Sequence, residues 1–520
     1  MQVDMVSINK QFPEVFDQSI KPLMAHFGID APDIMISELV LDSRDVAIHK
    51  AFIALNGHAL DGRNFIPQAI SLGAKVIVAQ CDDKSSHGQV EMREQSVIVW
   101  FFQLPEKLSE LAAQFYQHPA NSMSIIAVTG TNGKTSTVQL TSQLANLMGE
   151  QAASIGTLGA GMYSSNAEFE TQENTVNTTP DAISIQRLLA EFVNEGAFQV
   201  AMEASSHALV QNRIKAVKTD IAVFTNLSRD HLDYHGSMAE YALAKQLLLQ
   251  QPGLAYAVLN VNDPEHKNWL VNMPEQTTVV LFGQNISATD LPSEYRYCVA
   301  NNVRYTTDGI ALTLQSSWGD CELRLCLLAD FNVANVLAAI CSQLCLGKSL
   351  KQIAYIVQKL KPVAGRMELY SRQNQATIVV DYAHTPDALE KALMATKQHC
   401  DGKLYCVFGC GGDRDVGKRA LMGEIAERLS DKVIVTDDNV RSETPQDIIN
   451  DILSGCAYPQ SIQVEHDRKT AIKLAATQAS AGDMILVAGK GHENYQIIGT
   501  QTVAYDERQF VALLQKGKKV

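Results

Sequence analysis

The sequence predicts an α/β protein of three domains, in which an N-terminal domain precedes a central P-loop-type parallel sheet with helices and a C-terminal Rossmann-like domain. Its length of 520 residues is typical of about three domains. Short apolar runs alternate with helix-length stretches, which is the pattern of βαβ units. A glycine-rich turn at residues 127–140, between such a run and a helix, has the layout of a phosphate-binding loop.

Composition excludes several classes of function. The net charge of −14, without a basic stripe, argues against a nucleic-acid partner. No run approaches the ~18 apolar residues of a membrane span, and the first residues lack the pattern of a signal peptide. The ten cysteines are scattered without a CxxC pair, so we expect neither disulfides nor a structural zinc site. These observations predict a cytoplasmic protein without membrane insertion.

The pattern of elements divides the chain into three segments, 1–121, 122–360 and 361–520. The first has strand-like runs such as AFIAL and ends in the turn-rich sequence YQHPANS. The second alternates strands with helices and then, over residues 279–328, shows the alternation of antiparallel strands. The third has apolar runs that each lead into a loop rich in Gly, Asp, Asn or His. Ligands bind at such strand ends in open parallel sheets.

The stretch AVTGTNGKTSTVQL, from Ala127 to Leu140, predicts a phosphate site. Backbone N–H groups of a glycine turn at a helix N-terminus can hold phosphate oxygens. Lys134 would reach the terminal phosphates, and the Thr135 hydroxyl would ligate Mg²⁺. The stretch departs from the GxxxxGK[ST] pattern because Val128 occupies the position of the first glycine. An ordinary strand–turn–helix is the alternative interpretation.

Two further stretches of the second segment gather ionisable side chains. Glu203 follows a strand, where a carboxylate beside a phosphate loop is a natural Mg²⁺ ligand and a solvated side chain is the alternative. Residues 226–249 carry Asp230, His231 and, on a helix, Lys245. A His/Asp cluster suggests metal chemistry, although exposed loop residues are the more common explanation. A lone helical lysine is ordinarily a surface charge.

Three loops of the third segment carry charges at predicted strand ends. They are GCGGDRDVGKR at 409–419, DDNVRSETP at 437–445 and GKGHENYQ at 489–496. The first fails the dinucleotide pattern GxGxxG because Arg414 stands at the third glycine position. Acidic and basic groups on glycine turns instead suit a zwitterionic ligand. We expect the three loops to converge at one edge of the sheet.

In their order along the chain, the motifs resemble those of the Mur ligases, the ATP-dependent amide-forming enzymes of peptidoglycan precursor synthesis. The motifs are TGTNGKTS, EASSHAL, NLSRDHLDYHG…AK, FNVAN, AGRME, VDYAHTPDAL, GGDRDVGKR and DDNVR. The N-terminal LDSR…ALNGHALDGRNFIPQAI and the DNxR element are similar to those of the members that add diaminopimelate as the third peptide residue. The resemblance extends from about Leu41 to Gln496.

The resemblance implies a role for each matching residue. The residues matching the uridine site are Leu41, Ser43, His58, Ala59 and Leu60. The residues matching positions near the muramoyl-peptide are Asn177, Thr178, Thr179, Ser205, Gln211 and Arg213. The residues matching the ATP site are Gly130, Thr131, Asn132, Gly133, Lys134, Thr135, Ser136, Asn332 and Arg366. The residues matching the diaminopimelate site are Arg414, Asp438, Asn439, Val440, Arg441, Gly489 and Glu493.

The resemblance also implies the reaction and its cofactors. ATP would phosphorylate the D-glutamyl carboxylate of UDP-N-acetylmuramoyl-L-alanyl-D-glutamate. The amine of meso-2,6-diaminopimelate would then attack the acyl phosphate, giving an amide, ADP and phosphate. The implied catalytic residues are Lys134, Lys245, Glu203 and His231. The implied ligands of two Mg²⁺ ions are Thr135, Glu203, His231 and a carbamylated Lys245, which supplies an anionic oxygen. We expect a monomer.

Three features depart from the family's pattern. Val440 replaces a proline, whose fixed φ would stiffen the DNxR loop. The FNxxN element follows Leu328, Ala329 and Asp330, where a glycine is expected. Residues 162–177 form a longer insertion, which we expect to be a surface loop.

Several alternatives stay open at this point. A lysine-adding relative is the closest, and Arg441 argues against it because lysine lacks the second carboxylate. A folylpolyglutamate synthetase-like ligase would lack the N-terminal uridine motif and the DNxR element. A P-loop NTPase switch would leave the charged loops of the third segment unexplained. A non-catalytic scaffold would not need Lys134, Glu203 and Lys245 together.

Overall fold

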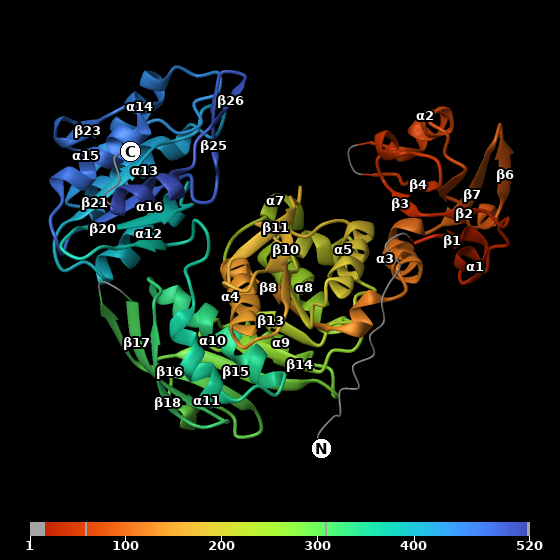
Figure 1. The fold of residues 1–520 in the computed structure, drawn as a ribbon, viewed down its shortest axis with the longest axis horizontal. Coiled ribbons are helices and arrows are strands. Elements are labelled where there is room, and N and C mark those ends of the chain that lie inside the picture. The colour runs from red at the N-terminus through yellow and green to blue at the C-terminus, as the bar shows by residue number, and fades with distance from the viewer. Residues whose placement is uncertain (1–15, 58–59, 307–308, 517–520) are drawn as a thin grey trace. The chain divides into compact units, whose positions relative to one another are not determined.

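The computed structural model describes residues 16–57, 60–306 and 309–516, and the chain forms two compact units (Figure 1). One unit holds the described residues up to Leu281 together with Cys341–Leu346, and the other holds Phe282–Ile340 and the described residues from Gly347 onward. Both contain parallel sheets with helices, so the predicted α/β fold class is confirmed. Within these ranges, no helix is long and apolar enough to cross a membrane.

The first unit begins with a five-stranded sheet of order β3-β4-β5-β7-β6, parallel except for β6. Val76 and Val78 pack into one core and Ile77 and Ala79 into another, as expected for a strand with both faces covered. The strands of this sheet are β3 (Glu38–Val40), β4 (Lys50–Ala54), β5 (Val76–Cys81), β6 (Val90–Arg93) and β7 (Ser96–Phe102), and a separate two-stranded sheet consists of β1 (Gln18–Ser19) and β2 (Met35–Ile36). The helices are α1 (Ile20–Ala25), α2 (Ile66–Ser71) and α3 (Leu104–Phe115).

A second sheet carries the phosphate loop, and its strand order as far as β14 is β11-β10-β9-β12-β8-β13-β14. From β9 to β14 the strands run parallel, so their carboxyl ends share one edge. The strands are β8 (Ser124–Thr129), β9 (Ala152–Gly156), β10 (Gly159–Tyr163), β11 (Phe169–Glu173), β12 (Gln199–Glu203), β13 (Ile221–Phe224) and β14 (Tyr256–Asn260). The helices are α4 (Lys134–Leu147), α5 (Ala182–Asn194), α6 (Ser206–Val210), α7 (Leu232–His235), α8 (Met238–Gln246) and α9 (His266–Val271). Strand β15 (Thr278–Gln284) passes from one unit to the other.

The predicted surface loop at residues 162–177 is wrong for residues 162–163 and 169–173, which belong to strands. β10 and β11 form an antiparallel hairpin in which Met162 faces Glu170 across the pair. Only glycine fits at Gly159 in β10. A Cβ there would lie 2.6 Å from the Thr171 methyl group and 2.7 Å from the Glu173 carbonyl oxygen, both in β11. The insertion therefore extends the sheet edge.

The second unit begins with the antiparallel strands expected for residues 279–328. β16 pairs with β17, and β17 pairs with β18, both antiparallel, so this prediction is confirmed. The elements are β16 (Arg296–Thr306), β17 (Gly309–Ser316), β18 (Cys321–Leu325), α10 (Asp330–Cys345) and α11 (Leu350–Ile356).

The rest of the second unit is a Rossmann-like layer of order β19-β20-β24-β21-β22-β23, parallel except for β19. Helices α12, α13 and α14 pack on one core, and α15 and α16 on the other. The strands are β19 (Glu368–Tyr370), β20 (Thr377–Asp381), β21 (Leu404–Phe408), β22 (Lys432–Val435), β23 (Gln463–Val464), β24 (Met484–Ala488), β25 (Tyr495–Ile498) and β26 (Gln501–Ala504). The helices are α12 (Pro386–Gln398), α13 (Gly417–Leu429), α14 (Pro445–Leu453), α15 (Arg468–Gln478) and α16 (Glu507–Gln515).

Candidate functional site

The predicted phosphate loop joins β8 to α4 and has the local geometry that such a loop requires. Gly130 has φ +146°, and a Cβ there would lie 1.9 Å from Thr225 Oγ1, so only glycine fits. Gly133 has φ +83° and directly precedes Lys134, the first residue of α4. The backbone N–H groups of the turn therefore lead into a helix N-terminus, which favours anions.

The chain after β13 holds this loop in place. Asn226 accepts at its carbonyl from the Thr131 N–H (2.8 Å) and at its side-chain oxygen from the Asn132 N–H (2.9 Å). The Thr225 hydroxyl donates to the Asn132 carbonyl at 2.6 Å. Thr225 and Asn226 are therefore structural parts of the loop that sequence reasoning missed, although both lie in the strand-end motif FTNLS.

Two lysines meet at one carbonyl of the loop. Lys134 Nζ donates to the carbonyl oxygens of Gly130 (2.9 Å) and Thr131 (2.8 Å). Lys245, on α8, donates to the same Gly130 oxygen at 2.8 Å and lies 4.2 Å from the centre of the Tyr241 ring. Lys245 is 1% exposed, and burial, together with the charge of Lys134, holds its pKa well below the usual value. It is therefore not an ordinary surface lysine.

Glu203 lies at the carboxyl end of β12, beside the phosphate loop. Its carboxylate is 1% exposed and accepts from the Thr135 hydroxyl (2.9 Å) and the Thr157 N–H (2.8 Å). A Cβ at Gly156 would lie 2.3 Å from Glu203 Oε1, so the neighbouring strand leaves just enough space for the carboxylate. The structure thus brings together Thr135 and Glu203, two predicted metal ligands.

The donor chemistry at this point fits a magnesium ion. A carboxylate and a hydroxyl beside a phosphate loop are the oxygen ligands that Mg²⁺ prefers. Among the described residues, however, no three His, Cys, Asp or Glu side chains form a group that could hold a metal by themselves. Glu203 and the Thr135 hydroxyl therefore supply only part of the ligand set that a metal ion would need at this site.

His231, the remaining predicted ligand, belongs to a cluster of aromatic rings. Its ring lies 4.9 Å from that of His207 and 6.1 Å from that of Tyr241. His235 completes the cluster, and its Nε2 lies 2.9 Å from the Ser206 hydroxyl. Burial and the neighbouring His231 and His235 lower the pKa of His207, so the neutral form of the His207 imidazole is favoured.

The residues predicted near the muramoyl-peptide gather at the end of β12. Arg213 donates to the Thr179 carbonyl (2.6 Å) and to Gln211 Oε1 (3.0 Å). The Thr179 hydroxyl donates to the Glu203 carbonyl and accepts from the Ser205 N–H at 3.0 Å. The Thr178 hydroxyl lies 3.2 Å from that of Thr157, whereas Asn177 is exposed. These contacts hold Thr179, Ser205, Gln211 and Arg213 as one connected group.

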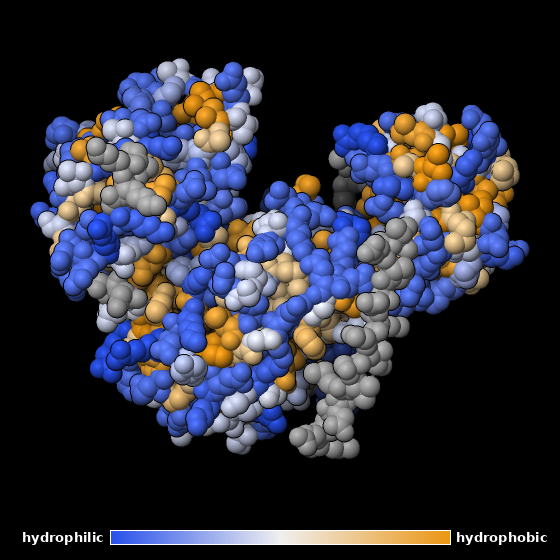
Figure 2. Space-filling model, viewed as in Figure 1, coloured by the Kyte–Doolittle hydropathy of each residue, from blue (hydrophilic) through white to orange (hydrophobic). Residues whose placement is uncertain are grey.

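The residues predicted for the uridine site differ in their burial. Ser43 is buried and donates to Gln68 Oε1 at 3.0 Å, and Leu41 packs against the core. Leu60 is 69% exposed. Figure 2 shows hydrophobic residues at the surface in the region of α2. His58 and Ala59 lie outside the described residues. Ser43 and Leu41 therefore lie in or against the core, whereas Leu60 lies at the surface.

In the second unit, the residues predicted near the nucleotide lie on two turns. Asn332, in the first turn of α10, is 6% exposed; its amide donates to the Leu328 carbonyl (2.7 Å) and accepts from Asn335 (3.0 Å). The Arg366 guanidinium lies 5.0 Å from the centre of the Tyr382 ring. Asn332 is therefore held internally, and Arg366 is placed beside an aromatic face.

The loops after β22 and β24 bring together three charged or amide side chains around a buried lysine. Lys490 Nζ donates to Asn439 Oδ1 (2.6 Å) and Glu493 Oε2 (3.0 Å) and lies 3.3 Å from Asp438 Oδ1. Asn439 Nδ2 also donates to Glu493 Oε2, at 3.1 Å. Gly489, at φ +118°, leaves room for Asp438, because a Cβ there would lie 2.7 Å from its Oδ2. Sequence reasoning missed Lys490, although it stands between two predicted residues.

Arg441 is anchored through one nitrogen. Its Nη1 donates to the Gly412 carbonyl (2.8 Å) and faces the Asn439 carbonyl (3.4 Å), so the hydrogen bonds described for its guanidinium leave Nε and Nη2 unused. The backbone N–H of Arg441 donates to the Ile497 carbonyl at 3.0 Å. Val440 is buried in the core. Val440 stands where the family's pattern has a proline. Core packing of Val440 and this backbone contact hold the loop without that proline. Arg414, in contrast, is exposed.

A buried ion pair lies next to this cluster. Arg468, on α15, pairs with Glu507, on α16, through Nε and Oε2 at 2.5 Å, and neither side chain is exposed. Arg468 also donates to the Ala488 carbonyl at 2.8 Å. Burial alone would raise the pKa of Asp438, but Arg468 and Lys490 hold it below its usual value. Asp438 therefore stays ionised in the folded protein.

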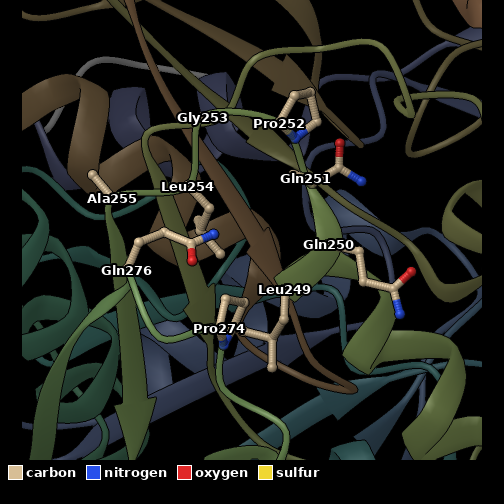
Figure 3. Close-up of a pocket in the computed structure, with 9 residues that line it drawn as sticks. All are labelled: Leu249, Gln250, Gln251, Pro252, Gly253, Leu254, Ala255, Pro274 and Gln276. Atoms are coloured by element: carbon tan, nitrogen blue, oxygen red, sulfur yellow. The ribbon is translucent and has the colours of Figure 1, made fainter.

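One cavity lies away from all of these residues (Figure 3). It has a volume of about 490 Å³ and is lined by Leu249, Gln250, Gln251, Pro252, Gly253, Leu254, Ala255, Pro274 and Gln276. It borders the start of β14, whereas the phosphate loop follows the end of β8, and the two strands run in the same direction. None of its lining residues is a predicted site residue, so this cavity is not the candidate site.

Comparison with known families matches three segments of the chain. Residues 35–116 match the model described as Mur ligase family, catalytic domain. Residues 128–343 match the Mur ligase middle domain, and residues 365–491 match the Mur ligase, glutamate ligase domain.

Solved structures give the same result. A UDP-N-acetylmuramoyl-L-alanyl-D-glutamate–2,6-diaminopimelate ligase is 34% identical over 97% of this chain and 100% of its own, with a TM-score of 0.71. MurF from Acinetobacter baumannii is 16% identical over 97% of this chain and 100% of its own (TM-score 0.63). Folylpolyglutamate synthase from Mycobacterium tuberculosis, complexed with ADP, is 16% identical over 74% of this chain and 92% of its own (TM-score 0.55). These two show the fold alone. The chain belongs to the Mur ligase family, a three-domain family of ATP-dependent, ADP-forming ligases of peptidoglycan precursor synthesis.

Proposed function

We propose that this protein joins meso-2,6-diaminopimelate to UDP-N-acetylmuramoyl-L-alanyl-D-glutamate and converts ATP to ADP and phosphate. The observation that carries the proposal is the group around Lys490 and Arg441, which offers both anionic and cationic partners to an amino acid with two ammonium and two carboxylate groups. The similarity to a ligase named for the same two substrates supports it.

In the first step, a D-glutamyl carboxylate oxygen attacks the γ-phosphorus of ATP, and the bond to the β,γ-bridging oxygen breaks to release ADP. Lys134 and the loop N–H groups would stabilise the charge on the transferring phosphoryl group. Arg213 and Thr179, which share a hydrogen bond, are the proposed contacts for the peptide part of the acceptor. The product is an acyl phosphate, in which the former carboxylate oxygen is a leaving group.

In the second step, the neutral amine attacks the acyl carbon, phosphate leaves and the nitrogen loses a proton. Glu493 is the proposed partner of the distal ammonium of diaminopimelate. Its Oε2 already accepts from Lys490 and Asn439, whereas its Oε1 accepts only a long hydrogen bond from the Tyr382 hydroxyl (3.5 Å), so Oε1 is the oxygen through which it would bind that group. The Nε and Nη2 edge of Arg441 is the proposed partner of the distal carboxylate, because that edge forms bidentate pairs.

Magnesium and a carbamate belong to the proposal as well. Thr135, Glu203, His231 and carbamylated Lys245 are the proposed ligands of two Mg²⁺ ions, which would neutralise phosphate charge. The burial of Lys245 and the carbonyl that it shares with Lys134 support the modification, because a carbamate removes one of two crowded cations. Asn332 and Arg366 are the proposed nucleotide contacts of the second unit.

We also propose a role for each segment of the chain. Segment 1–121 binds the uridine end of the acceptor, segment 122–360 carries the ATP chemistry, and segment 361–520 binds the amino acid. The first segment would bind through Leu41, Ser43, His58, Ala59 and Leu60. Arg414 would contact polar groups of the amino acid. We propose that the enzyme acts in the cytoplasm as a monomer.

Phosphate release measured in a coupled assay tests the proposal. The nucleotide-sugar dipeptide is combined with ATP, Mg²⁺ and, in parallel reactions, diaminopimelate, L-lysine or ornithine. We expect release only with both acceptor and amino acid present, and fastest with diaminopimelate. Equal rates with lysine would contradict the proposed substrate, and release from ATP alone would indicate a P-loop NTPase instead.

A further inference from the structure

A buried histidine of the second unit joins three segments of the chain. His399, directly after α12, is 2% exposed. Its Nδ1 lies 2.7 Å from the Thr306 carbonyl oxygen, and its Nε2 lies 3.0 Å from the Ala329 amide nitrogen. Thr306 ends β16, and Ala329 directly precedes α10. None of these residues belongs to the site described above.

The two partners fix the protonation state of the ring. A carbonyl oxygen can only accept, so Nδ1 must carry a hydrogen, and a backbone N–H can only donate, so Nε2 must be unprotonated. His399 is therefore neutral, with the hydrogen on Nδ1. Burial lowers its pKa below 6.5, while the hydrogen bond to Thr306 opposes this shift. The Tyr305 ring lies 5.2 Å away, and its hydroxyl donates to Asp330, the acidic group next to the turn.

Ala329 has a backbone conformation that an alanine rarely adopts. Its φ is +76°, in the left-handed region, where L-residues with a Cβ are strained by about 1–2 kcal/mol. Rotating the peptide group between Leu328 and Ala329 by half a turn would bring φ to a negative, unstrained value. The hydrogen bond from the Ala329 N–H to His399 opposes that rotation, because the rotated N–H would point away from the imidazole.

The same peptide group also holds Asn332. A peptide group is rigid and planar, so the Leu328 carbonyl and the Ala329 N–H point in fixed, opposite directions. The Leu328 carbonyl accepts from the Asn332 side-chain amide at 2.7 Å. His399 and Asn332 are therefore bound to the two ends of one rigid plane.

We infer that His399 is a positioning residue of the nucleotide site, which keeps the strained Leu328–Ala329 peptide in the orientation that presents Asn332. The inference rests on the proposed function, because it takes Asn332 as a nucleotide contact. It makes the affinity for ATP depend on a neutral imidazole that does not itself touch the ligand.

The test measures ADP affinity by calorimetry with the full chain, together with thermal unfolding. We expect His399→Ala to weaken ADP binding about three- to tenfold, the effect of one hydrogen bond. In the background of Ala329→Gly, which removes the strain, we expect His399→Ala to have a clearly smaller effect. A purely structural histidine would give the same loss in both backgrounds.

The pH profile is the second measurement. We expect the native protein to keep its ADP affinity through the ordinary titration range of histidine and to lose it at lower pH, because burial lowers the pKa of His399 and protonation of Nε2 removes the acceptor of the Ala329 N–H. The His399→Ala variant should lack this part of the profile. His466→Ala is the matched control, since His466 is an exposed histidine of the same unit, paired with Asp437 at 2.9 Å, and its loss should leave the profile unchanged.

Two results would overturn the inference. If Asn332→Ala weakens ADP binding but His399→Ala does not, His399 has no positioning role, while the nucleotide assignment stands. If Asn332→Ala binds ADP like the native protein, the nucleotide role of Asn332 fails and the inference fails with it. Should His399→Ala not fold, the double variant with Ala329→Gly and the native pH profile still decide between these outcomes.

Discussion

Lys134 and Lys245 direct their side-chain nitrogens at the same carbonyl oxygen, that of Gly130, at 2.9 and 2.8 Å. Two ammonium groups that share one acceptor in a buried place repel each other. Lys245 is the more deeply buried of the two, and its surroundings disfavour the charged form. The two lysines are therefore expected to have different chemical roles, although each is a lysine beside the same loop.

Replacing Lys245 by alanine should abolish ligation while the protein stays folded. The proposed carbamate would be lost, and with it an anionic oxygen next to Glu203. We expect phosphate release to fall at least about 10²-fold. A short carboxylic acid or a high bicarbonate concentration could be added to the assay, and partial recovery with the acid alone would support the carbamate. Near-native activity of the alanine variant would exclude it.

The Lys134→Ala variant should lose catalytic turnover but still bind the acceptor substrate. Removing a cation from the transferring phosphoryl group is expected to lower kcat by about 10²–10³. Binding of the nucleotide-sugar dipeptide, measured by calorimetry, should stay near the native value, because the proposed contacts of that ligand lie elsewhere. Loss of both properties together would mean that Lys134 maintains the fold of the loop.

Gly130→Ala should destabilise the first unit strongly. The new Cβ would lie 1.9 Å from Thr225 Oγ1 in a residue with positive φ, so we expect a loss of about 2–5 kcal/mol in the free energy of unfolding. Gly149→Ala is the matched control: its φ is +92°, yet a Cβ would meet nothing within 4 Å. It should lose only about 1–2 kcal/mol. Denaturant unfolding measures both, and equal losses would show that the Thr225 contact can relax.

Arg441 should decide the choice of amino acid. We expect Arg441→Ala to lower kcat/KM for diaminopimelate about 10²–10³-fold, as when one partner of a charge pair is removed. Affinities for ADP and the acceptor should be unchanged. Arg441→Lys is the informative second variant, because it keeps the charge but lacks the two-nitrogen edge. If the lysine variant equals the native enzyme, a bidentate contact is not needed.

Breaking the ion pair between Arg468 and Glu507 should destabilise the second unit. Arg468→Met leaves the Glu507 carboxylate buried without its cation, and the expected loss is about 3–5 kcal/mol. Lys397→Met is the control, since its pair with Asp431 is about half exposed and should contribute no more than about 1 kcal/mol. Thermal unfolding compares them. A small effect for Arg468 would mean that water reaches Glu507.

Local signals made much of the fold predictable. The phosphate loop, from Ala127 to Leu140, encodes its strand, turn and helix within a few residues, and α4 begins where the glycine turn indicates. Likewise, the strand ends that carry Glu203 and Asp438 follow apolar runs. The ligand assigned to each site residue stays a prediction, because it comes from the resemblance and not from the local pattern.

Contacts between distant residues were not predictable. Lys490 and Asn439 are 51 positions apart, and Arg468 and Glu507 are 39 apart, so no local pattern indicates that these charges are buried together. A charged residue on a helix ordinarily indicates a solvent-facing position. The hairpin of β10 and β11 escaped prediction for a similar reason, since its polar residues are stabilised by an edge of the sheet and not by burial.

The position of β24 has a consequence for biosynthesis. This strand lies between β20 and β21 and pairs with both, yet it follows them in the chain. It leaves the ribosome about 80 residues after the end of β21, which at ordinary translation rates takes on the order of 4–16 s. During that interval both strands present apolar, unpaired edges, which is a state prone to misassembly. The nascent chain is thus expected to be prone to misassembly until β24 has emerged.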